Sequence, residues 1–249
     1  MDFNIINLPK VKSTNSYAQK QIEKKALKEG DVIFTLNQEE GKGHGNNIWE
    51  SEPNSNLLAS IILQPVTVEA SNQFVLTQII SLAIIDLINE YITNKSQKVK
   101  IKWPNDIYVG DFKIAGILFQ NFIKGNKIEH SIIGIGINVN QAKFLSSAPN
   151  PISLIHYTNK STDIYKLLQK LLTNISVYYE KYSINSNYLE LKTRYINTLY
   201  RYKIWADYGD NNGHFRGQIV DIDQYGRLIV KIESGIEKVY NFKEIRFIH

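Results

Sequence analysis

The amino-acid sequence predicts an α+β fold, in which helices pack on a mixed or antiparallel sheet and a small β-barrel follows. Two long stretches carry apolar residues at helical spacing, and the apolar strands between them are joined by two-residue turns that contain glycine. After residue 203 the pattern changes to short alternating segments separated by turn residues. We therefore expect a larger domain over residues 1–200 and a barrel over residues 201–249.

The N-terminal elements follow from capping residues and apolar spacing. Ser13 or Thr14 can cap a helix whose apolar positions continue up to Gly30, because both hydroxyl side chains accept hydrogen bonds from free helix N–H groups. The segment after the second strand has no usable period and is expected to be a long loop. In chain order the elements are a strand at 3–8, a helix at 13–30, a strand at 32–36 and a loop at 38–56.

The middle of the chain predicts the rest of the sheet and its helical cover. A long helix at 72–91 carries a broad apolar stripe and must therefore cover a sheet. Gly110-Asp111 and Gly125-Asn126 are placed as two-residue hairpin turns. The remaining elements are strands at 57–63, 98–103, 107–109, 112–122 and 127–138, a polar linker-like stretch at 146–151, and helices at 163–182 and 188–198.

The last residues predict a small barrel with strands at 203–207, 215–222, 228–232 and 238–242. A unit of this size buries little apolar surface by itself, so we expect it to pack on the larger domain.

Composition excludes several classes of protein. With 249 residues, 43% of them hydrophobic and 21% charged, the chain has ordinary globular proportions. The absence of cysteine excludes disulfides, thiolate zinc sites and a cysteine nucleophile. We find no apolar run near the length of a membrane span and no signal peptide, and therefore expect a cytoplasmic protein that does not bind membranes. The net charge of +5 only weakly favours anionic partners.

Two kinds of hydrolytic or metal chemistry are disfavoured. No serine lies in a G-x-S-x-G turn, which serine hydrolases of the α/β class use. The scattered histidines show no spacing typical of metal ligands; they are His130, His156, His214 and His249.

The first segment that could bind a ligand is the glycine-rich loop at 38–51. Glycines at alternate positions allow backbone N–H groups to approach a ligand closely, while Lys42 and His44 add positive or switchable charge. The loop is neither a Walker loop nor a dinucleotide fingerprint. Trp49 favours a role in covering something flat or apolar. The alternative is a mobile surface loop.

A second segment, 102–118, places polar side chains on a rigid hairpin. Lys102, Asn105 and Asp106 surround a proline at a strand end, and Lys113 lies on the return strand among small and apolar residues. We expect Lys113 to point into a restricted space. The alternative is an edge-strand lysine that prevents aggregation.

Two further segments are candidates for ligand binding alongside the loop and the hairpin. Gly134 and Gly136 lie on the same face of a strand, so a flat ligand or another backbone should lie against that face. Close helix packing is the alternative. The residues Ser13, Thr14 and Asn15 would otherwise be only a helix cap.

In this order, Ser13-Thr14-Asn15, the glycine loop from Gln38 to Trp49, KWPNDIYVGDFKIAGIL at 102–118 and GIGINVN at 134–140 resemble the biotin protein ligases, also called holocarboxylase synthetases. The resemblance extends from about residue 10 to the C-terminus. It implies a catalytic domain similar to class II synthetases and a C-terminal SH3-like barrel. Because only twelve residues precede Ser13, we expect a short form without the DNA-binding domain of some members.

The family resemblance also implies a reaction in two steps. Biotin and MgATP give biotinyl-5′-AMP and pyrophosphate, and the biotinyl group then passes to a lysine of a biotin carboxyl carrier domain. The expected partners are therefore biotin, ATP with Mg²⁺, and the carrier domain, with no DNA, no permanently bound cofactor, and a homodimer as one allowed assembly.

The resemblance assigns roles residue by residue. Lys113 matches the catalytic lysine, whose ammonium can neutralise both the attacking carboxylate and the α-phosphate. Asp106 falls near phosphate and Mg²⁺, and Trp49 falls where an aromatic side chain covers the adenine. The expected biotin-binding residues are Ser13, Thr14, Asn15, Gln38, Gly41, Lys42 and Gly116. The expected ATP-binding residues are Lys42, Gly43, His44, Trp49, Lys102, Asn105, Asp106, Asn138 and Asn140.

The glycine loop departs from the common family pattern G-R-G-R-x-G-R-x-W. Lys42 replaces the first arginine, and His44 and Asn47 stand where arginine is common. The loop therefore carries less positive charge than usual. We expect it to retain the reactive acyl-adenylate less tightly.

Three other functions stay open at this stage. A lipoate ligase or octanoyltransferase shares the architecture, although the KWPND segment argues against it. A non-catalytic protein that binds biotin or a nucleotide would have no need of Lys113. The hypothesis of an RNA-binding protein is supported only by the basic composition and the predicted barrel.

Overall fold

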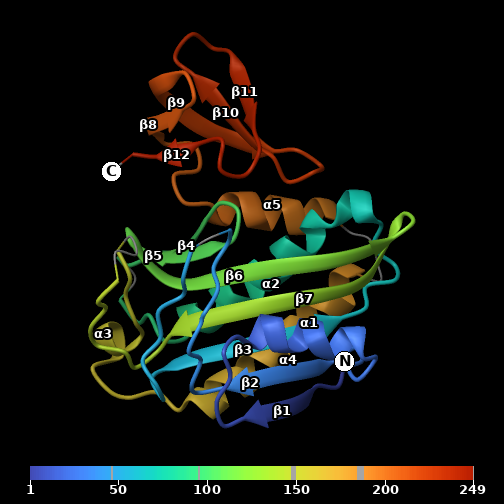
Figure 1. The fold of residues 1–249 in the computed structure, drawn as a ribbon. Helices are drawn as coiled ribbons and strands as arrows, with labels where there is room; N and C mark the ends of the chain where they lie inside the picture. The colour runs from blue at the N-terminus through green and yellow to red at the C-terminus, as the bar shows by residue number, and fades with distance from the viewer. Residues whose placement is uncertain (46, 95, 147–149, 184–187, 249) are drawn as a thin grey trace.

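The computed structural model describes residues 1–45, 47–94, 96–146, 150–183 and 188–248, in a larger domain and a smaller C-terminal one (Figure 1). The larger domain is built on a seven-stranded sheet of order β1-β2-β3-β7-β6-β5-β4. β1 and β2 are parallel and the other neighbours are antiparallel, which confirms the predicted mixed sheet. The strands are β1 (Asn4–Leu8), β2 (Asp31–Thr35), β3 (Asn56–Leu63), β4 (Val99–Lys102), β5 (Asp106–Val109), β6 (Phe112–Lys124) and β7 (Lys127–Asn138).

Helices cover both faces of this sheet. In Figure 1, α1 lies in front of the strands and α2 and α4 lie behind them. In β3, Leu57, Ala59 and Ile61 join the core that includes α2 and α4, whereas Ile62 packs with Ala18 of α1. Burial on both faces explains why β3 is apolar except at Asn56 and Ser60. The helices are α1 (Thr14–Glu23), a 3₁₀ turn η1 (Ala70–Asn72), α2 (Phe74–Asn89), α3 (Ile155–Thr158), α4 (Ile164–Ser183) and α5 (Tyr188–Thr198).

The central helix α2 corrects one expectation from the sequence. Residues 70–89 are long and apolar enough to cross a membrane by length and composition, so a run of that size is present. However, 72% of its most apolar window is buried inside the protein. It is therefore the core helix of the larger domain, packed against α4 and α5.

The first helix is shorter than the sequence predicts. It ends at Glu23, because Lys25 adopts a left-handed φ of 56°, which a helix cannot continue. Leu27 continues the apolar spacing of the helix in the sequence. In the structure it lies in the loop after α1 and packs against the cluster that contains Ala18. The elements α3 and β12 were missed because four and two residues are too few to show a period.

The two predicted hairpin turns are confirmed. Gly110 (φ 59°) and Gly125 (φ 62°) each begin a two-residue connection, the first between β5 and β6 and the second between β6 and β7. The linker-like stretch at 146–151 lies partly outside the described residues, which omit 147–149. Its last residues belong to the larger domain, since Pro151 pairs with Lys113 of β6.

The C-terminal domain is a five-stranded antiparallel sheet of order β11-β10-β9-β8-β12. Its small core includes Tyr208, Ile219 and Val230, all fully buried. The predicted boundary at residue 201 falls between the end of α5 and the start of β8. The strands are β8 (Trp205–Asp210), β9 (Gly213–Ile222), β10 (Leu228–Ile232), β11 (Glu237–Tyr240) and β12 (Arg246–Phe247).

The C-terminal domain packs on the larger domain, as its size predicted. The indole Nε1 of Trp103 donates a hydrogen bond of 2.9 Å to the carbonyl oxygen of Gly226. Gly226 has φ 84°, and its Cα faces the ring of Phe74 so closely that a Cβ atom would overlap the ring. A bare backbone at this position is therefore what allows the two domains to meet.

We expect Gly226→Ala to lower the free energy of unfolding by about 1–3 kcal/mol more than Gly235→Ala, the range typical of an overpacked contact. Both glycines have φ near 85°, but no atom lies within 4 Å of the Cβ position at Gly235. The shared cost of a positive φ therefore cancels in the comparison. Urea denaturation measures both values, and equal losses would contradict the contact between Gly226 and Phe74.

Candidate active site

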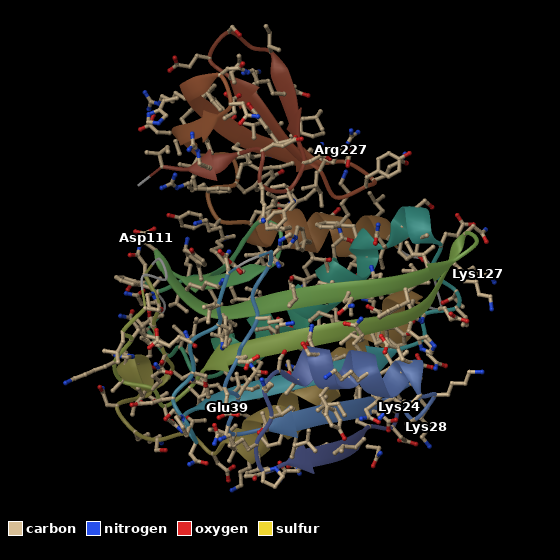
Figure 2. All side chains as sticks on the ribbon, in the orientation of Figure 1. Lys24, Lys28, Glu39, Asp111, Lys127 and Arg227 are labelled. Carbon is tan, nitrogen blue, oxygen red and sulfur yellow. The ribbon has the colours of Figure 1, made fainter. Side chains whose placement is uncertain are left out.

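A cavity of about 530 Å³ lies where the glycine loop, the β5–β6 hairpin, β7 and the C-terminal domain meet. Figure 2 labels Asp111 at the tip of the β5–β6 hairpin and Lys127 near the opposite end of the sheet. Lys113 is the second residue of β6, directly after this tip. The cavity lining brings together sequence-predicted residues from all four segments: Ser13, Thr14, Asn15, Gln38, Lys42, Gly43, His44, Trp49, Lys102, Asn105, Asp106, Lys113 and Gly116, with Gly134 and Gly136.

Lys113 is held in the cavity from two directions. Its backbone N–H donates to the carbonyl of Asn150 (2.7 Å), and its carbonyl accepts from the N–H of Ile152 (2.9 Å). Its side-chain Nζ lies 2.7 Å from Oδ1 of Asp106, and the two side chains are 24% and 29% exposed. The ammonium is thus partly desolvated, paired and close to the ligand space, which rules out the edge-strand interpretation for this lysine.

The Ser-Thr-Asn turn serves as a helix cap and as part of the cavity wall. Ser13 accepts from the N–H of Ser16 (3.4 Å) and so caps α1. The backbone N–H and the hydroxyl of Thr14 both donate to Oε1 of Gln38, at 2.9 and 3.2 Å. Asn15 is fixed by the hydroxyl of Ser60 (2.5 Å) and by the carbonyl of Leu118 (3.4 Å). The cap and binding interpretations are therefore compatible.

The glycine face of β6 and β7 is covered by side chains of this chain. The indole of Trp49 lies against both Gly116 and Gly136, and the amide of Asn15 lies against Gly134. A Cβ atom at any of these glycines would overlap its neighbour. The indole Nε1 of Trp49 is buried and finds no hydrogen-bond partner in the described part of the chain. Trp49 therefore reaches the groove that the sequence predicted and leaves one donor there unused.

Three predicted residues do not line the cavity. The carbonyl of Gly41 accepts from the N–H of Trp49 (2.9 Å), which closes the base of the loop. Asn138 is buried at the end of β7 and donates to the carbonyl of Ile152 (3.0 Å). Asn140 exchanges two hydrogen bonds of 2.9 Å with the backbone of Thr162. In this structure both asparagines fix the chain that follows β7, and their adenine-binding role stays a prediction.

The C-terminal domain supplies a wall that sequence reasoning missed. Phe242, Lys243, Ile245, Arg246 and Phe247 line the cavity, although they lie far along the chain from the other segments. In the sequence these residues stand out only by their basic and aromatic side chains. That composition does not indicate which surface of the larger domain the segment contacts.

The same wall changes the environment of two titratable side chains, His44 and Lys102. The ring of His44 packs edge-on against Phe242 with centroids 4.3 Å apart. Burial, and secondarily the charge of Lys243, lower the pKa of His44, so the neutral imidazole is favoured. Burial also lowers the pKa of Lys102, whose Nζ lies 3.1 Å from the hydroxyl of Tyr108 and over the ring of Phe247.

The charge of the lining favours anionic ligands. Among the described lining residues, the lysines and arginine are Lys42, Lys102, Lys113, Lys243 and Arg246, and the single carboxylate is that of Asp106. Within the described residues no group of three or more His, Cys, Asp or Glu side chains could hold a metal ion, while His249 lies outside them. The side-chain cations of this lining are the groups that could offset the charge of an anionic ligand.

Comparisons with known proteins cover both domains. The family model "Biotin/lipoate A/B protein ligase family" matches residues 8–138, and "Biotin protein ligase C terminal domain" matches residues 209–242. The bifunctional ligase/repressor BirA of Bacillus subtilis is 28% identical over 229 residues, which cover 86% of this chain and 65% of BirA. The BirA of Escherichia coli is 31% identical over 143 residues, covering 57% of this chain and 43% of that protein.

The fold comparison extends over the whole chain. A solved structure described as biotin protein ligase from Aquifex aeolicus in complex with biotin and ATP has a TM-score of 0.80 and 25% identity, and the match covers 98% of this chain and 99% of that one. This agreement confirms the α+β fold with its C-terminal sheet domain. The match to Bacillus subtilis BirA covers 65% of that protein's length. Because the family model matches more than half of its residues, this chain belongs to the biotin/lipoate A/B protein ligase family.

Proposed function

We propose that this chain is an ATP-dependent biotin protein ligase, which forms biotinyl-5′-AMP and then transfers the biotinyl group to a lysine of a biotin carboxyl carrier domain. The observation that carries the proposal is the Lys113 ammonium, which lies in one cavity with the Ser-Thr-Asn turn, the glycine loop and four further cations. The solved Aquifex relative that matches the whole chain is described as a complex with biotin and ATP, which supports the same ligands here.

The first step brings two anions together. A carboxylate oxygen of biotin attacks the α-phosphorus of ATP, a new P–O bond forms, and the bond to the β-phosphate oxygen breaks to release pyrophosphate. Lys113 offsets the repulsion between the carboxylate and the phosphate, because its charge is preorganised and partly desolvated. Thr14 and Gln38 of the lining offer the polar pairing that a neutral ureido ring requires.

The second step releases AMP. The neutral ε-amine of the acceptor lysine attacks the acyl carbon, the bond to the phosphate oxygen breaks, and the amine loses its proton to solvent. Until then the mixed anhydride must be kept from water, which is the role we assign to the glycine loop.

Magnesium enters this proposal as part of the substrate MgATP. Mg²⁺ is commonly held by one or two carboxylates together with substrate phosphates and water. Asp106 is the one carboxylate in the lining and can take that role, whereas the described residues offer no larger acidic set.

Lipoate is the rival substrate, because the family's description includes lipoate ligases. The match of residues 209–242 to a domain described for biotin protein ligases favours biotin. Pyrophosphate release that depends on biotin and not on lipoate would decide for this proposal. The homodimer and the cytoplasmic location stay predictions from the sequence.

We expect Lys113→Ala to lower the rate of biotinyl-adenylate formation by about 10²–10³, the usual cost of one preorganised electrostatic donor. Biotin-dependent pyrophosphate release in single-turnover mixtures measures this rate. Lys124→Ala is the matched control, since Lys124 lies on the same strand but is 80% exposed. Pyrophosphate release by Lys113→Ala at the wild-type rate would refute the assignment.

We expect His44→Arg to slow the escape of biotinyl-adenylate at pH 8, because arginine adds a permanent charge where the imidazole is neutral. The pKa of His44 is lowered, so the wild-type side chain gains its charge only as the pH falls below the ordinary range for histidine. The advantage of the variant should therefore shrink toward acidic pH. Rapid filtration measures how much labelled biotinyl-adenylate each protein retains. Equal retention by His44→Arg and the wild type at pH 8 would contradict a role for this charge.

A further inference from the structure

Glu50 follows Trp49 directly and binds a second segment of chain with its carboxylate. One carboxylate oxygen accepts from the backbone N–H of Leu145 and the other from that of Ser146, both at 2.8 Å. The side-chain amide of Gln141 donates a third hydrogen bond at 3.3 Å. Burial alone would raise the pKa of Glu50, but these hydrogen bonds hold it below its usual range. The carboxylate is therefore ionised and its bonds are charge-assisted.

Two buried amides tie the same pair of segments together beneath Glu50. Asn56, at the start of β3, donates to Oε1 of Gln141 (2.6 Å) and accepts from the N–H of Val139 (2.9 Å). Oε1 of Gln141 also accepts from the N–H of Glu52 (2.9 Å). The C-terminal base of the glycine loop and the chain leaving β7 thus form one hydrogen-bonded unit.

The chain that Glu50 holds at one end meets the reactive lysine at the other. After the stretch that Glu50 binds, Asn150 and Ile152 pair with the backbone of Lys113 on both sides. Asn138, where this stretch leaves β7, also donates to the carbonyl of Ile152. A single stretch, described at 138–146 and 150–152, therefore contacts the base of the Trp49 loop and the strand that carries Lys113.

We propose that Glu50 is a positioning residue: it ties the Trp49 end of the glycine loop to residues 141–146, so that the indole stays over Gly116 and Gly136 while ligand is bound. Glu50 does not line the cavity, so it acts through Trp49 rather than by touching substrate. The inference rests on the proposed ligase function, because retention of an acyl-adenylate is what the tie secures.

The tie follows from the way the loop is anchored. The loop between Gly41 and Trp49 is closed by the Trp49 N–H bond to Gly41 and the Gly43 N–H bond to Asn47. Neither bond connects the loop to the rest of the cavity wall. The exposed Ile48 adds little burial, at 80% exposed. The ionised carboxylate of Glu50 is therefore a strong fixed point immediately beside Trp49.

The test compares Glu50→Gln with Glu52→Gln in the full-length chain. The same chemical change is made in both, but Glu52 is exposed and is not among the residues that line this cavity. We expect Glu50→Gln to shorten the retention of labelled biotinyl-adenylate by about tenfold, which corresponds to about 1.4 kcal/mol. The single-turnover rate of its formation at saturating biotin and MgATP should change less than twofold, and Glu50→Asp should recover part of the retention.

Hydrogen exchange at the Leu145 and Ser146 amides provides a readout that needs no activity. Both amides should exchange faster in Glu50→Gln than in Glu52→Gln. If retention in the two variants is equal, or if formation and retention fall together with melting temperature, the positioning role is wrong. If the wild-type protein forms no biotinyl-adenylate while the exchange difference persists, the proposed function fails and the tie between the two segments stands.

Discussion

The rest of the site depends on the placement of one ammonium group. Lys113 lies on β6 at a point where the adjoining strand supplies Asp106 at 2.7 Å and the 150–152 stretch pairs with its backbone. Leaving this lysine in bulk solvent would screen its charge. The hairpin and the ion pair together keep the charge close to the ligand space, which is the requirement for bringing two anions into contact.

The absence of side chains on neighbouring strands is as important as the charge. Gly116 and Gly136 are paired across β6 and β7, so their bare faces form one continuous floor. Trp49 lies on that floor, and Glu50 links Trp49 to the chain that reaches back to Lys113. The indole contacts the glycine floor by packing. Glu50 bonds to Leu145 and Ser146, and Asn150 and Ile152 bond to the backbone of Lys113, although these residues come from separate parts of the sequence.

Much of this arrangement could be predicted from local pattern. The turns at Gly110 and Gly125, the strand carrying Lys113 and the apolar strand β3 follow from residue types at short spacing. The docking of Phe242, Lys243 and Arg246 on the cavity could not, because no local pattern specifies which surfaces of two domains meet. Asn140 shows a second limit of local pattern: its amide bonds to the backbone of Thr162, a partner that only the tertiary fold brings near, and its predicted ligand-binding role stays a prediction.

The measurement that tests the account most directly follows one oxygen atom. Biotin carrying ¹⁸O in its carboxylate is incubated with the protein and MgATP, hydroxylamine is added as acceptor, and the AMP released is analysed by mass spectrometry. Attack of the carboxylate on the α-phosphorus beside Lys113 predicts AMP that contains one ¹⁸O atom, with biotin hydroxamate as the other product. Unlabelled AMP, or no biotin-dependent AMP at all, would contradict the claim that this cavity joins a carboxylate to a phosphate.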